Sequence, residues 1–101
     1  MSSSGNGHFF SVHLSHHVRD RVKNLQFEEL EKGKGLRFLH ALRAIYDHLR
    51  KEPTTFGNPL YRLPAMDLTV YSAVVSPLVV YFAVHQTKPL VFVKGIERIS
   101  E

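Results

Sequence analysis

Residues 66–99 read MDLTVYSAVVSPLVVYFAVHQTKPLVFVKGIERI and carry the pattern that decides the fold. Three apolar runs in this stretch are rich in the β-branched and aromatic residues typical of strands: Asp67–Val75, Leu78–Val84 and Leu90–Ile96. Ser76–Pro77 and His85–Pro89 separate the runs. Such short connections join antiparallel neighbours, because a parallel return needs a crossover of about a dozen residues or more. The stretch therefore predicts a three-stranded antiparallel meander.

The middle run is apolar on both of its alternating sides. Val79 and Tyr81 share one side, and Val80 and Phe82 share the other. A sheet with one face in water normally alternates apolar with polar residues, so both faces of this sheet require cover. Large exposed apolar patches usually mark interaction sites. We therefore predict that Val79, Tyr81 and Phe92 bind a partner.

Two helices are predicted before the meander. The first spans 16–32, with Ser15 as its N-cap and Val18, Val22 and Leu25 on one apolar stripe. The second spans 36–51, and its own stripe recurs at i, i+4, i+7 and i+11: Phe38, Leu42, Ile45 and Leu49. The short glycine-containing link between them predicts an antiparallel helix hairpin that covers one face of the sheet.

The end of the first helix is predicted to be wet on one side. Phe27 and Leu30 extend its apolar stripe, whereas the carboxylates crowd on its solvent surface: Glu28, Glu29 and Glu31. Gly33 is suited to the left-handed conformation that ends a helix. No pair of carboxylates stands out for acid–base chemistry.

The whole chain predicts an α+β fold in the order β-α-α-β-β-β, with the helices packed on one face of the sheet. A short strand is expected within Phe9–Leu14, and 53–63 is expected to be a turn-rich loop around Gly57–Asn58–Pro59. Residues 1–8 are predicted to be a flexible tail, and residues 9–101 a single domain.

Composition narrows the classes of function. The 101 residues contain no cysteine, which removes disulfides, thiolate catalysis and cysteine-based zinc sites. No apolar run reaches the ~18 residues that a membrane helix requires, and no secretory signal is visible, so we expect a cytoplasmic protein without a membrane partner. The net charge of +4 favours an acidic partner such as nucleic acid, or else only keeps a small protein dissolved.

The spacing of the seven histidines does not indicate a metal site. His13, His16 and His17 cluster in sequence, but they lack the spacing that brings three or four ligands onto one zinc ion. No metal and no cofactor are therefore expected.

Basic residues near the two helices are candidates for nucleic-acid binding: Arg19, Lys34 and Arg37. Clustered cations neutralise phosphates. The alternative is a solvated helix surface on which acids and bases alternate.

Several segments resemble the RelE/ParE superfamily of bacterial toxins from toxin–antitoxin pairs. After the short strand and the two helices, the segments that carry this resemblance are Leu49–Pro53, Phe56–Leu63, Pro77–Tyr81 and Val91–Ile96. Together with the order of elements, the resemblance covers Phe9 to Ile99. It implies the β-α-α-β-β-β fold and a partner antitoxin that lies across the toxin and neutralises it. Members of the RelE kind cleave ribosome-bound mRNA without metal, and ParE-like members act on DNA gyrase.

The catalytic residues of RelE-like members are largely unmatched. Leu78 stands where the family usually has an arginine, and Gly95–Arg98 replaces a basic residue followed by His or Tyr. The remaining catalytic candidates are three cations: Arg62, Lys94 and Arg98. Stabilising a phosphorane and supplying a proton requires groups that converge on one site.

The sequence therefore predicts a toxin-like protein that binds an antitoxin-like protein, or itself as a homodimer, through the sheet and without competent mRNA cleavage. One alternative is a metal-independent mRNA endoribonuclease, ribosome-dependent or free. A second is a small basic nucleic-acid-binding protein. RNA, the ribosome and gyrase are the targets that the resemblance implies.

Overall fold

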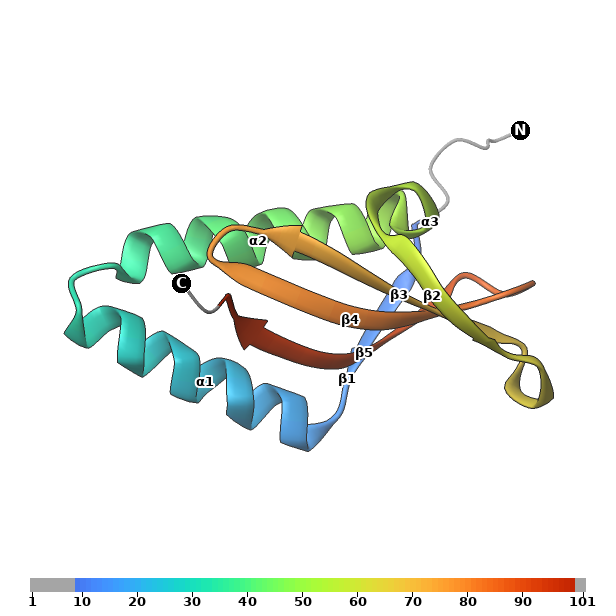
Figure 1. The fold of residues 1–101 in the computed structure, drawn as a ribbon, viewed down its shortest axis with the longest axis horizontal. Helices are drawn as coiled ribbons and strands as arrows, with labels where there is room; N and C mark the ends of the chain where they lie inside the picture. The colour runs from blue at the N-terminus through green and yellow to red at the C-terminus, as the bar shows by residue number, and fades with distance from the viewer. Residues whose placement is uncertain (1–8, 100–101) are drawn as a thin grey trace.

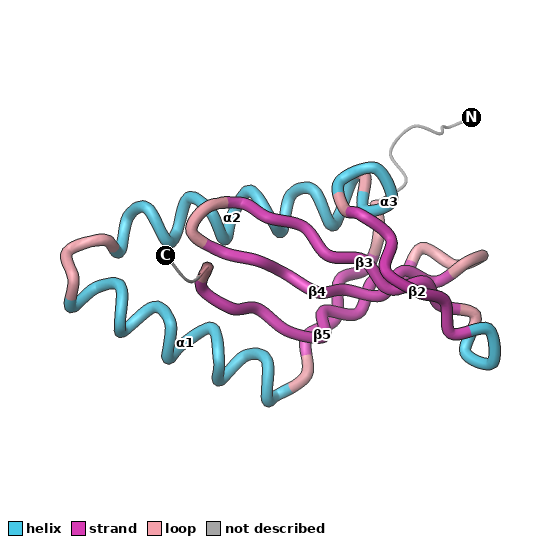
Figure 2. Tube along the Cα trace, viewed as in Figure 1, coloured by secondary structure: helices cyan, strands magenta, loops and turns pink. Residues whose placement is uncertain are grey.

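The computed structural model describes residues 9–99, which form helices on a single sheet (Figure 1). The predicted flexible tail, residues 1–8, lies outside the described residues. The elements in chain order are β1 (Ser11–Leu14), α1 (His16–Glu31), α2 (Gly35–Lys51), α3 (Pro53–Phe56), β2 (Asn58–Leu63), the 3-10 helix η1 (Pro64–Met66), β3 (Leu68–Val75), β4 (Leu78–His85) and β5 (Leu90–Arg98). The predicted α+β class, with a strand and two helices ahead of an antiparallel meander, is confirmed (Figure 2). Within these residues no helix is long and apolar enough to cross a membrane.

The sheet has five strands in the order β1-β5-β4-β3-β2. The β3–β4–β5 meander is antiparallel throughout, as predicted. β1 pairs in parallel with β5, from Ser11 opposite Leu90 to Leu14 opposite Val93. Because a parallel return needs a long crossover, the whole helical half of the chain lies between these two partners.

The fifth strand, β2, lies where the sequence predicted only a loop, so that prediction was wrong over residues 58–63. β2 is an edge strand that pairs antiparallel with β3, with an irregularity between Pro59 and Tyr61. An edge position tolerates proline because no second neighbour needs its missing N–H. The turn residues ahead of it form the short helix α3, which has Pro53 in its first turn.

The two long helices begin and end within one residue of the predicted bounds. Ser15 is the N-cap of α1, and its hydroxyl accepts a hydrogen bond from the Val18 amide at 3.2 Å. Gly33 adopts a φ of 74° after the last turn, a conformation that costs glycine little. From this link α1 and α2 diverge, and the ends of β4 and β5 lie in the opening between them (Figure 1).

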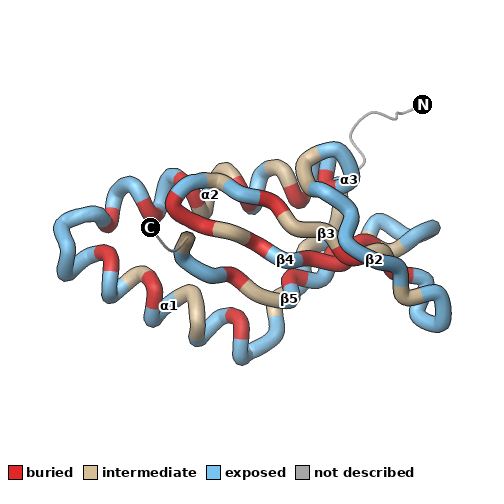
Figure 3. The backbone as a smooth tube through the Cα atoms, in the orientation of Figure 1, coloured by how far each residue is buried: buried red, intermediate tan, exposed pale blue. Residues whose placement is uncertain are grey.

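The core lies between the two helices and one side of the sheet (Figure 3). Phe38 of α2 and both Val80 and Phe82 of β4 are fully shielded from solvent, each 0% exposed. Phe82 stacks on Tyr71 and Phe56, with ring centroids 5.5 and 5.9 Å apart. The apolar stripes of the two helices form this core together with strand residues. The helices contribute Val18, Leu25, Ile45 and Leu49, and β5 contributes Val91 and Ile96.

The predicted stripe of α1 is wrong at its far end. Phe27 and Leu30 are 69% and 56% exposed. Glu29, expected on the wet surface, is instead the only buried charged residue in the described part of the chain, at 3% exposed. Val18, Leu25 and Glu29 fall at i, i+7 and i+11, so the stripe continues through the carboxylate.

Candidate functional site

The side of the sheet away from the helices is partly uncovered. Five residues of four strands share this side, and we call this set the open face: His13, Val74, Val79, Tyr81 and Phe92. Val74 pairs with Val79 and His13 with Phe92. Val74 is 64% exposed, Tyr81 38% and Phe92 36%. The three residues predicted to bind a partner, Val79, Tyr81 and Phe92, therefore lie on the same side of the sheet.

The chain itself covers the other half of that side. Leu68, Val70 and Ala83 form a second buried cluster, against which Leu63 at the end of β2 packs. The apolar pattern on both sides of β4 therefore has two explanations: a small core at one end and the open face at the other.

The open face is held in shape by local contacts. The ring of Tyr81 lies over Gly95, where an added Cβ would stand 3.9 Å from Tyr81 Cδ2. His13 stacks on Phe92 with ring centroids 5.5 Å apart. At the margin, Glu97 pairs with Arg21 of α1 at 2.6 Å. The face is thus apolar and aromatic, with its marginal carboxylate already neutralised.

A second apolar surface lies on the helix side. A groove of about 400 Å³ opens between α1 and α2 over β1 and β5. Leu39 and Tyr46 on its wall are 45% and 48% exposed, and Val22 and Leu42 are half-buried. The sequence placed Val22 and Leu42 on core stripes and gave no sign of this groove, because stripe spacing does not report how far two helices diverge.

The three catalytic candidates do not come together. Arg62 pairs with Thr69 at one end of the ladder, and Thr69 pairs with Val84 of β4. Arg98 pairs with Leu78 at the opposite end of β4. Six residues of strand separate these positions, roughly 20 Å at 3.3 Å per residue.

Lys94 lies apart from both arginines, in the middle of β5. It occupies the irregularity where the ladder passes from Phe82 opposite Val93 to Tyr81 opposite Gly95. The described residues therefore show no convergent catalytic set from these three cations.

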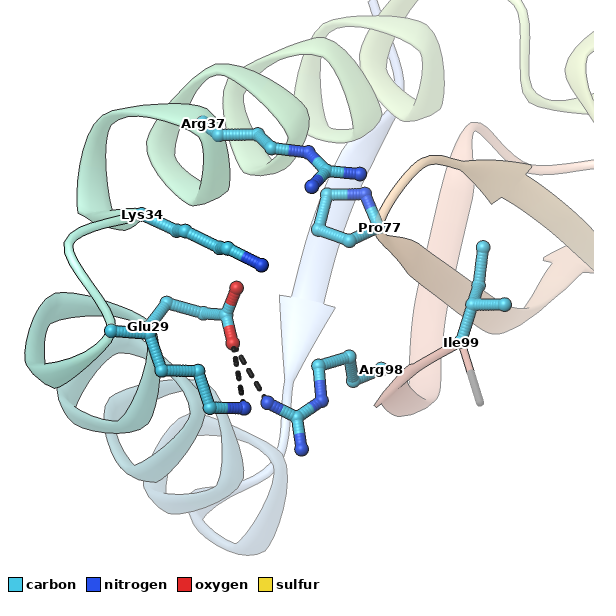
Figure 4. A pocket seen from close by; sticks show the side chains of 7 residues that line it. Glu29, Lys34, Arg37, Pro77, Arg98 and Ile99 are labelled. Carbon is cyan, nitrogen blue, oxygen red and sulfur yellow. Dashed lines mark hydrogen bonds and ion pairs between the residues drawn. The ribbon is translucent and has the colours of Figure 1, made fainter. Parts of the chain in front are cut away.

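Arg98 instead belongs to a basic pocket at the closed end of the helix hairpin (Figure 4). The cavity measures about 340 Å³ and takes residues from the end of α1, the link, the start of α2, the β3–β4 turn and the end of β5. Its lining is Glu29, Lys32, Lys34, Arg37, Pro77, Arg98 and Ile99, which we call the basic pocket. The strand ends are joined there by a hydrogen bond from the Ile99 amide to the Pro77 carbonyl at 2.8 Å.

Glu29 is the counterion of the basic pocket. Its carboxylate accepts a hydrogen bond from Arg98 Nη1 at 2.8 Å and lies 3.7 Å from Lys32 Nζ. The hydrogen bond from Arg98 lowers the pKa of Glu29, and the charges of Lys32, Arg98 and Lys34 lower it further, against burial that raises it. The carboxylate is therefore ionised and orients two of the four cations.

Two predicted nucleic-acid-binding residues form the other wall of this pocket. Arg37 donates from Nη2 to the Ser76 hydroxyl at 3.1 Å, and Lys34 points toward the cavity (Figure 4). Arg19 is not with them: it lies in the first turn of α1, where its Nε donates to the Leu14 carbonyl at 3.4 Å. The structure thus brings Lys34, Arg37 and Arg98 together and leaves Arg19 at the far end of a 16-residue helix.

Comparison of the chain with models of protein families, with curated proteins and with solved structures finds no match. The likeness to RelE/ParE toxins accordingly stays a prediction from the sequence.

Proposed function

We propose that this chain is a toxin-like protein that binds a protein partner through the open face, without cutting mRNA. The partner is an antitoxin-like chain or a second copy of the protein, and the binding takes place in the cytoplasm. One observation carries the proposal: Val74, Tyr81 and Phe92 are exposed on the same side of three neighbouring strands. Contiguous apolar surface of this kind is typical of interaction sites.

The charge around the open face favours an acidic partner. Lys94 is exposed on β5, and the carboxylate of Glu97, at the margin of this face, is paired with Arg21. Aromatic residues such as Tyr81 and Phe92 supply much of the binding energy at protein interfaces. An amphipathic chain with acidic flanks would therefore complement the apolar side chains and the charge of this surface.

A matched pair of variants tests the surface. Phe92→Ser removes an aromatic ring from the open face, and Phe27→Ser removes one that is 69% exposed on α1, away from it. We expect Phe92→Ser, and not Phe27→Ser, to abolish self-association in light scattering, or binding of an acidic chain encoded beside this one. A wild-type protein that stays monomeric at high concentration and binds no such chain would sink the proposal.

Expression in growing cells separates this function from the alternative of RNA cleavage. Growth arrest with mRNA cleavage that disappears in Arg62→Ala, Lys94→Ala and Arg98→Ala would favour the endoribonuclease. We expect no mRNA cleavage, because Arg62 and Arg98 pair with residues at opposite ends of the ladder.

A further inference from the structure

We propose that the basic pocket binds a phosphate group carrying two or more negative charges, as a phosphomonoester or a diphosphate. The proposal is independent of partner binding at the open face, since the pocket lies on the helix side of the sheet, beside the residue pair Leu78 and Arg98.

The first argument for a phosphate ligand is the charge balance of the pocket. Among the described residues, four cationic side chains line the cavity with a single carboxylate, so these residues carry a net charge of +3: four minus one. Glu29 is in direct contact with only two of those cations, Arg98 and Lys32. A monovalent carboxylate ligand would leave most of this excess in place, whereas a phosphate dianion or a diphosphate would offset it.

The second argument is the arrangement of the cations around the cavity. The cations come from separate parts of the chain and surround one hollow of about 340 Å³, a size typical of small-ligand sites. Arg37 and Arg98 stand on opposite walls, and each is already held by a contact, to Ser76 and to Glu29. Guanidinium groups fixed in this way bind phosphate oxygens with little further loss of side-chain entropy.

The lining also limits which part of a ligand is recognised. The seven described residues include no aromatic side chain on which a nucleotide base could stack. The charges of this lining therefore favour the phosphate over the rest of the ligand. Two sources supply such a group: a free diphosphate or nucleotide, and the 5′-phosphate end of a nucleic acid.

Calorimetric titration with inorganic diphosphate at low ionic strength tests the site. We expect binding that weakens as salt rises, and that falls about tenfold or more in the double variant Lys34→Gln, Arg37→Gln, because charge-assisted hydrogen bonds are lost. The control is Lys23→Gln, Lys88→Gln, which removes the same charge at exposed positions outside the pocket. Equal losses in the two double variants, or no diphosphate binding by the wild type, would overturn the proposal.

The source of the phosphate is resolved by two further ligand pairs. ADP is compared with adenosine, and a 5′-phosphorylated RNA with the same RNA bearing a 5′-hydroxyl. Preference for ADP alone identifies a free nucleotide, and preference for the phosphorylated RNA identifies a nucleic-acid end. A hexaglutamate peptide that binds as tightly as diphosphate would contradict the phosphate assignment.

Glu29→Gln gives a second readout, in thermal stability. This substitution removes the one carboxylate among the described lining residues and leaves Arg98 and Lys32 without this counterion. Diphosphate should then raise the Tm of the variant by more than it raises the Tm of the wild type, because the ligand replaces the lost charge. An equal or smaller shift counts against the site. If the variant does not fold, the comparison at the exposed residues Lys34 and Arg37 still decides.

Discussion

The two sides of β4 show how one apolar strand serves two purposes. Val80 and Phe82 are completely buried beneath the helices, whereas Tyr81, between them in sequence, is 38% exposed on the other side. The difference arises from what the rest of the chain places on each side: two long helices on one, and only the end of β2, at Leu63, on the other. The comparison teaches that the helix side is packed into the core, whereas the open face stays in contact with solvent.

The largest effect on stability is expected when a phenylalanine is removed from each side of the sheet in turn. Phe82→Ala should destabilise the protein by about 3–5 kcal/mol, because a fully buried ring leaves a cavity. Phe92→Ala, on the open face, should cost about 1 kcal/mol or less. Urea unfolding curves measure both, and equal losses would contradict the division between the two sides.

Gly57 marks how tightly the helix side is packed. A Cβ at this position would stand 2.8 Å from Phe82 Cζ and 3.0 Å from the Ser72 carbonyl oxygen, which is backbone and cannot rotate away. We expect Gly57→Ala to cost about 1–3 kcal/mol through overpacking. The fall in the urea midpoint of unfolding measures this loss of stability. An unchanged midpoint would show that the α3–β2 junction can move to accept the added methyl group.

The ionised Glu29 makes the helix side sensitive to acid. Its pKa is lowered in the folded protein, chiefly by the hydrogen bond from Arg98. The unfolded chain therefore binds the proton first as pH falls, and the stability due to this group is present above the ordinary value of 4.5 and lost below it. Unfolding measured from pH 7 to pH 3 should show this loss in the wild type and a smaller one in Glu29→Gln, while an identical profile would refute it.

The smallest effect on stability is expected at Val74. Val74→Thr keeps a β-branched side chain at a position that is 64% exposed, so the free energy of unfolding should change by about 0.5 kcal/mol or less. Val80→Thr places the same hydroxyl where exposure is 0%, and should cost about 1–3 kcal/mol if the group finds no partner. If the two substitutions have the same effect, the open face is not open in solution.

Local signals in the sequence predicted much of the fold. Ser15 and Gly33 marked helix ends because capping depends on a few neighbouring residues. Proline turns placed the meander for the same reason. β2 was missed because turn residues outweigh strand signals around Pro59, and only its edge position makes a strand there tolerable.

The candidate site was less predictable, because it depends on contacts between distant segments. Glu29 and Arg98 are 69 positions apart in sequence, and nothing local indicates that they meet. One signal was present: Glu29 continues the apolar stripe of Val18 and Leu25, and a charge at a stripe position must be paired if it is buried. The open face was predictable because its apolar pattern lies within single strands.

The parallel pairing of β1 with β5 fixes the order in which this protein can acquire its structure. Ser11 meets Leu90 across 79 positions of sequence, 90 minus 11. The helices α1 and α2 can form early from local interactions, but Val91 and Ile96, part of the surface they pack on, arrive with β5. Contacts so distant slow folding. A chain still being synthesised therefore carries two amphipathic helices with an incomplete base, and its native sheet closes only after β5 has been made.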